Sequence, residues 1–191
     1  MISYEWVEDN GHYPLLQPMS ELTGAVFARK SIDLLMTNAG LLGGQYNASW
    51  ERATAMVIGA GNIGLNAMNV FLRNNYKVIV IDKHPETLRE RMLPLMGDLE
   101  LENGKVEIVK FDESNSIESV NKIRLLLPTT DIVINAAVRR STFPKSTCEF
   151  IITKEDLSLM KPNSILCDAT ACDNDYIETA ISSESLSDWY K

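Results

Sequence analysis

Short apolar runs alternate with amphipathic stretches along most of this chain. The apolar runs predict buried β-strands at residues 55–58, 77–81, 106–109, 131–135 and 164–168. Apolar residues at helical spacing predict helices at 20–37, 62–74, 85–96 and 116–127, and a short helix after Thr153 with Asp156 at its capping-box position. Strands that alternate with helices indicate an α/β, Rossmann-like doubly wound parallel sheet. By analogy with other folds of this kind, we expect the strand order 3-2-1-4-5.

The first predicted helix is an N-terminal extension to this alternation. Residues 1–19 form an irregular lead-in, and Ser20 is expected to cap the helix. Its apolar stripe consists of Leu22, Val26, Ile32, Leu35 and Met36. Such a stripe would be an aggregation liability in water, so we expect it to pack against another protein surface, most simply in a homodimer. The glycines at 38–47 predict a flexible connector, which separates a lead-in and helix at 1–50 from a domain at 51–191.

The segment 55–82, AMVIGAGNIGLNAMNVFLRNNYKVIVID, carries the clearest chemical signal. Gly59, Gly61 and Gly64 form a G-x-G-x-x-G turn between a strand and a helix, and Asp82 ends the next strand, eighteen residues after Gly64. In this context Gly59 allows the tight turn, Gly61 lets the backbone approach a pyrophosphate, and Gly64 lets the helix pack closely on the strand. Asp82 would accept hydrogen bonds from the adenosine ribose. The alternative is a glycine turn that binds nothing.

The pattern therefore predicts a dinucleotide-binding Rossmann domain whose cofactor is NAD. NADP is possible, because Lys83 and His84 follow Asp82 and would soften its repulsion of a 2′-phosphate. The predicted cofactor contacts are Gly59, Ala60, Gly61, Asn62, Ile63, Gly64, Asp82 and Lys83, with Asn135, Ala136 and Ala137 on the nicotinamide-ribose side. Asp112, after the third strand, fits either the adenine end of this site or an ordinary turn.

Composition narrows the choice of partners. The net charge of −8, with no basic cluster longer than Arg139–Arg140, argues against nucleic acid. No apolar run approaches the ~20 residues that span a bilayer, and the acidic N-terminus does not resemble a signal peptide. Three cysteines without C-x-x-C spacing suit a reducing cytoplasm, and we assign no metal ligands. The expected partners are a small-molecule substrate or a partner protein.

Several stretches together resemble the alanine dehydrogenase and transhydrogenase nucleotide-binding domain. They are PLLQPMSELTG at 14–24, VIGAGNIG at 57–64, DIVINAAV at 131–138 and ITKEDLSLMKPNSILCDATACD at 152–173. IET at 177–179 also suits the branch that contains N5-(carboxyethyl)ornithine synthase. The resemblance implies an NAD(P)-dependent oxidoreductase that transfers hydride between a nicotinamide and an amino acid, a 2-oxo acid or an imine. The family's catalytic lobe, with its substrate-binding arginine and its catalytic lysine and histidine, has no counterpart in this sequence.

The resemblance also implies a catalytic aspartate after the fifth strand, which falls on Cys172 or on Asp173 according to how the segment is aligned. We favour Asp173, for which a solvated loop acid is the alternative. Arg139 and Arg140 follow the fourth strand and could grip a substrate carboxylate or a cofactor phosphate, or could lie in solvent or at a subunit interface. His12 is a further candidate if a neighbouring subunit supplies it. Two classes of function remain: an oxidoreductase, and a non-catalytic dinucleotide-binding module or partner subunit.

Overall fold

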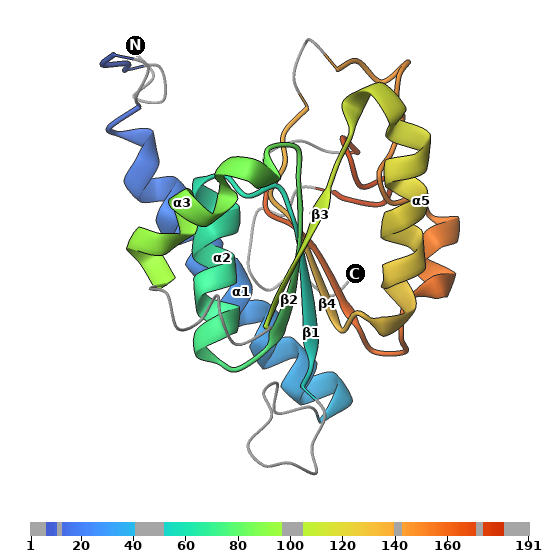
Figure 1. Cartoon of the computed structure of the whole chain (residues 1–191). Coiled ribbons are helices and arrows are strands. Elements are labelled where there is room, and N and C mark those ends of the chain that lie inside the picture. Colours follow the sequence, from blue (N-terminus) through green and yellow to red (C-terminus); the bar gives the residue numbers. More distant parts are fainter. Residues whose placement is uncertain are drawn as a thin grey trace.

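The sheet has the predicted order. In the computed structural model, which describes residues 7–10, 13–40, 52–96, 105–139, 143–170 and 174–181, five parallel strands run β3-β2-β1-β4-β5. Their bounds are β1 Thr54–Ile58, β2 Lys77–Asp82, β3 Val106–Lys110, β4 Ile132–Asn135 and β5 Ile165–Asp168. Val57 in the central strand aligns with Val80 of β2 and with Ile134 of β4. The doubly wound architecture is therefore confirmed (Figure 1).

Helices cover both faces of the sheet. On one face lie α1 (Leu16–Ala39), α2 (Asn62–Arg73) and α3 (Pro85–Met96), and on the other lies α5 (Ser116–Leu126) (Figure 1). The short helices are η2 (Glu113–Asn115), η3 (Leu127–Thr129) and η4 (Glu155–Leu159). Alternation along β1 divides the core: Ala55 and Val57 pack towards α1 and α2, whereas Met56 and Ile58 pack in the cluster on the α5 side. No helix in the described segments is long and apolar enough to cross a membrane.

The first helix begins earlier than predicted. It starts at Leu16, so Ser20 lies inside it rather than at its cap, and it runs on to Ala39, into the segment expected to be a connector. Pro18 is tolerated because it lies in the first helical turn, where backbone N–H groups have no intrahelical acceptor. Gly40, in the left-handed conformation, ends the helix. Most of the expected connector, from residue 41 to residue 47, lies outside the described residues.

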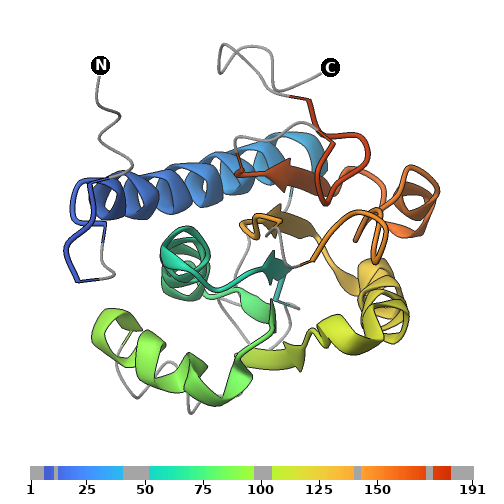
Figure 2. The same cartoon turned by 90° about the horizontal axis from the view of Figure 1, so that it is seen from above.

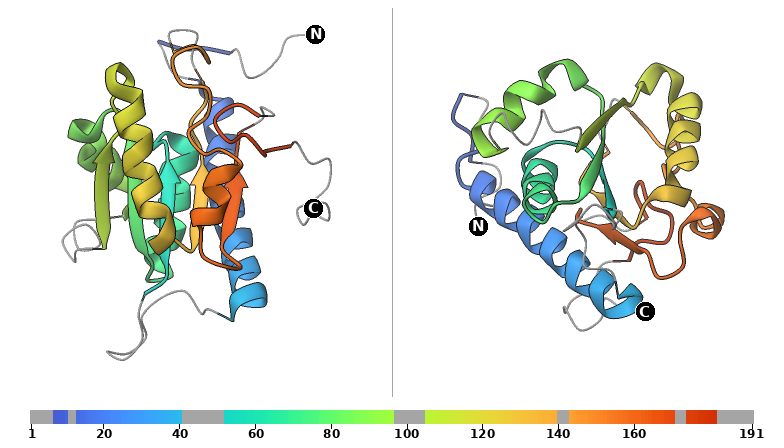
Figure 3. Two further views of the ribbon diagram at one scale, coloured as in Figure 1. Left: turned by 90° about the vertical axis from the view of Figure 1, so that its right-hand side faces the viewer. Right: turned by 60° about the horizontal axis from the view of Figure 1, so that its bottom comes forward.

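The long helix α1 packs on its own domain. It runs alongside α2 and reaches β4 and β5 (Figure 2 and the right-hand view of Figure 3). Ile32 and Leu35 of the predicted stripe are buried there, but Leu22, Val26 and Met36 are exposed. Two of the five stripe residues are thus covered within the chain. The homodimer stays a prediction that now concerns the three exposed ones.

Gly24 sets the closeness of α1 to α2. A Cβ at this position would overlap the carbonyl oxygen of Ile63, in the first turn of α2. The absence of a side chain therefore lets the α1 backbone touch the turn that follows the G-x-G-x-x-G glycines.

Two local predictions after β4 have different outcomes. The capping box before η4 is confirmed: the Thr153 N–H donates to Asp156 Oδ2 at 2.9 Å, and the Asp156 N–H donates to Thr153 Oγ1 at 3.3 Å. The composition of segment 136–152 predicts a long polar loop. Its described residues form neither a helix nor a named strand, as predicted, but Phe143, Ile151 and Ile152 are buried in the core cluster on the α5 side of the sheet. This segment takes the place of a covering helix.

Candidate functional site

The structure requires glycine at positions 59 and 64 of the G-x-G-x-x-G turn for different reasons, and does not require it at position 61. Gly59 has a φ of 89°, which L side chains rarely adopt, and a Cβ there would lie 2.9 Å from atoms of Ala137. A Cβ on Gly64 would overlap the carbonyl oxygen of Gly59. Gly61, by contrast, has an ordinary φ of −76°, and a Cβ there would meet no atom of the described residues within 4 Å. Neither backbone nor packing requires glycine at position 61.

Gly61 is also the N-cap of α2, and no side chain caps this helix end. The N–H groups of the first helical turn have no intrahelical acceptors, and the helix dipole places a partial positive charge beside them. This helix N-terminus is open and uncapped, and the glycine beside it is not required by the fold. It therefore has the shape and the charge that a phosphate group requires.

Asp82 lies opposite this turn, at the carboxyl end of β2. Its side chain is nearly buried and accepts hydrogen bonds from the N–H of Ala60 (2.8 Å), the N–H of His84 (2.8 Å) and the guanidinium of Arg91 (3.0 Å). Burial alone would raise the pKa of the Asp82 carboxyl, but these hydrogen bonds and the Arg91 charge together hold it below its ordinary value. Asp82 is therefore an anion throughout the neutral range.

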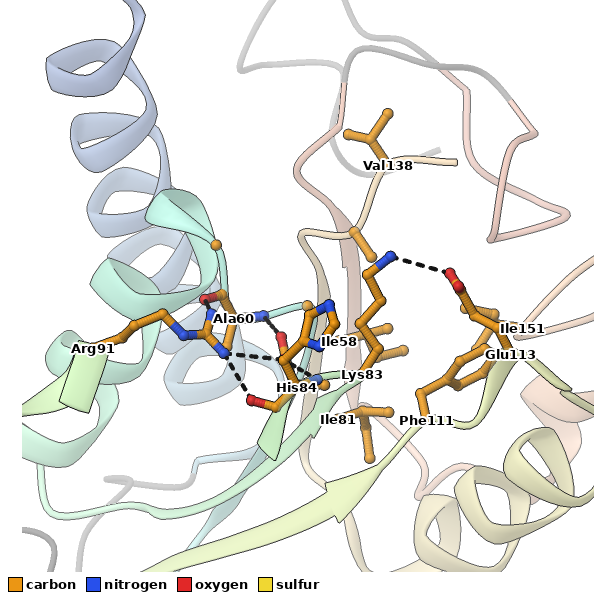
Figure 4. Close-up of a pocket in the computed structure, with 14 residues that line it drawn as sticks. Ile58, Ala60, Ile81, Lys83, His84, Arg91, Phe111, Glu113, Val138 and Ile151 are labelled. Carbon is orange, nitrogen blue, oxygen red and sulfur yellow. Dashed lines mark hydrogen bonds and ion pairs between the residues drawn. The ribbon is translucent and has the colours of Figure 1, made fainter. Parts of the chain in front are cut away.

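Arg91 was missed in the sequence. It lies on α3 and donates to the carbonyl oxygens of Ala60 (2.5 Å) and His84 (3.2 Å) as well as to Asp82, so it ties the glycine turn to the end of β2 (Figure 4). The one available signal was its position three residues after Leu88, a buried residue of α3. That position places Arg91 near the inward face of the helix.

These groups surround one pocket at the carboxyl edge of the sheet (Figure 4). Its lining consists of Ile58, Gly59, Ala60, Gly61, Ile81, Asp82, Lys83, His84, Arg91, Phe111, Glu113, Ala137, Val138 and Ile151. The structure thus brings Gly59, Ala60, Gly61, Asp82, Lys83 and Ala137 together. Asn62, Ile63 and Gly64 lie in the adjoining first turn of α2. Lys83 Nζ pairs with Glu113 Oε1 at 3.3 Å on the side of the pocket away from Arg91.

Asn135 and Ala136 do not line this pocket. The Asn135 side chain is fully buried, donates to Asp168 Oδ1 at 3.1 Å and accepts from the Ala137 N–H at 3.2 Å. The Ala136 N–H donates to Ile58 O at 2.8 Å and so extends the sheet pairing. Asn135 therefore shapes the turn that brings Ala137 to the pocket.

The two carboxylate oxygens of Asp168, at the end of β5, differ in their hydrogen bonding. Oδ1 accepts from Asn135 and from both the N–H and the hydroxyl of Thr170, while Oδ2 is buried without a hydrogen-bond partner among the described residues. Burial raises the pKa of the Asp168 carboxyl; the hydrogen bonds to Oδ1 oppose the rise without cancelling it, and the charge of Asp175 adds to it.

We expect Asp168→Asn to stabilise the protein by about 1 kcal/mol at neutral pH, because asparagine keeps the accepting oxygen and removes a poorly compensated charge. The gain should depend on pH. The unfolded carboxyl ionises near pH ~3.9, and the folded one only at higher pH, so the stability of the wild type falls as pH rises between those two values, whereas the variant has no such loss. Urea unfolding of both proteins at about pH 4 and about pH 7 measures the difference. A variant that is less stable at pH ~7 would contradict this account.

Arg139 is committed to structure. Its guanidinium donates to Asp175 Oδ1 (2.6 Å) and to the carbonyl oxygens of Cys148 (2.7 Å), Glu149 (2.8 Å) and Asp175 (2.9 Å), and it lies 4.4 Å from the ring centre of Tyr176. These contacts hold residues 174–177 against the segment after β4. The predicted grip on a substrate carboxylate would have to break them.

The remaining candidates divide by position. Asp112 accepts from Ser114 N–H at 2.9 Å and so begins η2, which is the turn role. Burial raises the pKa of the Cys148 thiol and raises that of Cys167 to about 12, so neither is a thiolate nucleophile at neutral pH. Asp173, Cys172, Arg140 and His12 lie outside the described residues.

Known proteins are similar to this chain over most of its length. The family model "Alanine dehydrogenase/PNT, C-terminal domain" matches residues 22–187. Two alanine dehydrogenases are similar in sequence. The one from Staphylococcus epidermidis is 27% identical, and the match covers 93% of this chain and 44% of the relative. The one from Mycolicibacterium smegmatis is 31% identical, and the match covers 87% of this chain and 41% of the relative. The chain spans less than half of the length of these relatives.

Solved structures agree on the fold. An L-alanine dehydrogenase superposes with a TM-score of 0.65 at 22% identity, over 87% of this chain and 42% of that one. A transhydrogenase from Sinorhizobium meliloti gives a TM-score of 0.56 at 21% identity, over 79% and 38%. With the family model matching most of its length, this chain belongs to the alanine dehydrogenase/PNT C-terminal domain family, as a nucleotide-binding domain.

Proposed function

We propose that this domain binds a nicotinamide dinucleotide in the pocket between the glycine turn and Asp82. The observation that carries the proposal is Gly61, a glycine that neither backbone nor packing requires, at an uncapped helix N-terminus. A bound pyrophosphate accounts for it, because any side chain at Gly61 would occupy the space that the phosphates need.

The residues divide the binding task. The N–H groups of the first α2 turn would hold the pyrophosphate, and Asp82 would accept from a ribose hydroxyl. Phe111 and Ile151 give the pocket apolar walls suited to a base. The nicotinamide supplies hydride chemistry when bound. What this chain contributes is the position of the dinucleotide. Asp82 and Arg91 hold the glycine turn through Ala60, and Asn135 holds the turn after β4 through Ala137.

We further propose that the domain serves an oxidoreductase that acts on an amino acid and its 2-oxo acid, since the similar proteins are named alanine dehydrogenases. Asp173 is the proposed acid–base group. It follows β5 in the sequence, and substrates of such folds bind beyond the carboxyl ends of the strands. The second candidate is a dinucleotide-binding module without its own chemistry. It is favoured by Arg139, whose guanidinium is occupied by structural contacts.

The test measures binding and turnover separately. Calorimetry with NADH tests the pocket, and the loss of NADH absorbance with pyruvate and ammonium tests the reaction. Wild type that binds and oxidises NADH, with turnover reduced on the order of 100-fold or more in Asp173→Asn, supports the enzyme. Binding without oxidation assigns the module. Absence of NADH binding would refute the proposed function.

A further inference from the structure

The Arg91 guanidinium changes what the pocket can accept. A carboxylate has about four acceptor positions, and Asp82 uses three of them for Ala60, His84 and Arg91. One position is left for a ribose that offers two hydroxyl groups. That position is on Oδ2, which also accepts from the Ala60 N–H. The Arg91 guanidinium binds Oδ1 at 3.0 Å and the Ala60 carbonyl oxygen, so it flanks the same carboxylate and the same turn.

The charged side chains around Asp82 are paired with partners of opposite charge. An unpaired acid at the end of β2 rejects a 2′-phosphate by like-charge repulsion, but the charge of Asp82 is compensated by Arg91. Lys83 pairs with Glu113, and His84, which is mostly exposed, contacts Glu86 at 3.4 Å. Arg91 is held by three acceptors and its side chain is still 33% exposed, so the cation is both fixed and reachable.

We propose that Arg91 is the cofactor-selecting residue of this domain, and that through it the pocket accepts 2′-phosphorylated dinucleotides, NADP(H), beside NAD(H). The inference rests on the proposed function. The chemistry is that of a guanidinium and a phosphate, which form strong charge-assisted hydrogen bonds. Arg91 orients and neutralises, and it has no part in hydride transfer.

The experiment isolates the 2′-phosphate. Calorimetry compares AMP with 2′-phospho-AMP, and NADH with NADPH, on wild type, Arg91→Gln and Arg91→Lys. Arg89→Gln is the matched control, because Arg89 is an exposed arginine on the same helix that does not line the pocket. In wild type, 2′-phospho-AMP should bind about tenfold more tightly than AMP. Arg91→Gln should remove that preference, Arg91→Lys should keep part of it, and Arg89→Gln should leave it unchanged.

The ratio of the affinities for 2′-phospho-AMP and AMP separates a selecting role of Arg91 from a structural one. If Arg91 only braces the turn, Arg91→Gln weakens AMP and 2′-phospho-AMP by the same factor, and the unchanged ratio overturns the inference. Weaker binding of 2′-phospho-AMP than of AMP to wild type also overturns it, while NADH binding leaves the proposed function intact. If neither NADH nor AMP binds to wild type, the proposed function itself fails. Circular dichroism confirms that each variant is folded.

Discussion

Gly61→Val should abolish dinucleotide binding without unfolding the protein. The backbone at Gly61 has a φ of −76° and a ψ of −167°, an extended conformation that suits a β-branched residue, and its Cβ direction is clear of protein atoms. The added side chain would instead project where the pyrophosphate must approach the first turn of α2. We expect affinity for NADH to fall on the order of 100-fold, from the cost of overfilling a closely fitted site.

The measurement is a titration with NADH beside a thermal melt of each protein. Gly61→Ala is the graded control, since one methyl group should cause a smaller loss of affinity with the same melting temperature. Equal affinities of Gly61→Val and wild type for NADH would refute the assignment of the phosphate site. A collapse of the melting temperature in Gly61→Val would instead show that the fold requires this glycine.

The second large effect concerns stability. Gly24→Ala should lower the free energy of unfolding by about 2–3 kcal/mol, because the new Cβ would overlap the carbonyl oxygen of Ile63 and force α1 away from α2. Denaturant unfolding followed by circular dichroism measures this. Gly61→Ala again provides the comparison: it makes the same chemical change in open space and should alter stability by less than about 0.5 kcal/mol. Equal unfolding free energies for Gly24→Ala and wild type would contradict the predicted contact.

The strands were predictable because their signals are local, whereas their order followed by analogy with other folds of this kind. Each strand is a short apolar run bounded by turn residues, and β1 and β2 differ from the predicted ranges by one residue at an end. The start of α1 was not predictable in this way. Pro14 and Pro18 indicated an irregular lead-in, but a proline costs little in a first helical turn.

The side-chain network of the site depends on tertiary placement. Nothing in the residues around Arg91 indicates that α3 carries it to the glycine turn, because the contact joins positions 31 residues apart. Arg139 illustrates the reverse case. Its residue type and its place after β4 suggested a ligand, whereas the acid that occupies it, Asp175, is 36 residues farther along the chain. A motif locates the backbone of such a site, and the fold decides which charges face it.

The packing of α1 also has a consequence for folding during synthesis. This helix precedes the sheet in the sequence, yet Ile32 and Leu35 belong to a cluster completed by Ile165 and Cys167 of β5. During synthesis the apolar face of α1 therefore leaves the ribosome well before the strand that helps to bury it. Contacts so distant in sequence form slowly, since a long loop must close first. Until β5 emerges, this face of α1 lacks part of the surface that buries it, and apolar surface exposed in this way promotes aggregation.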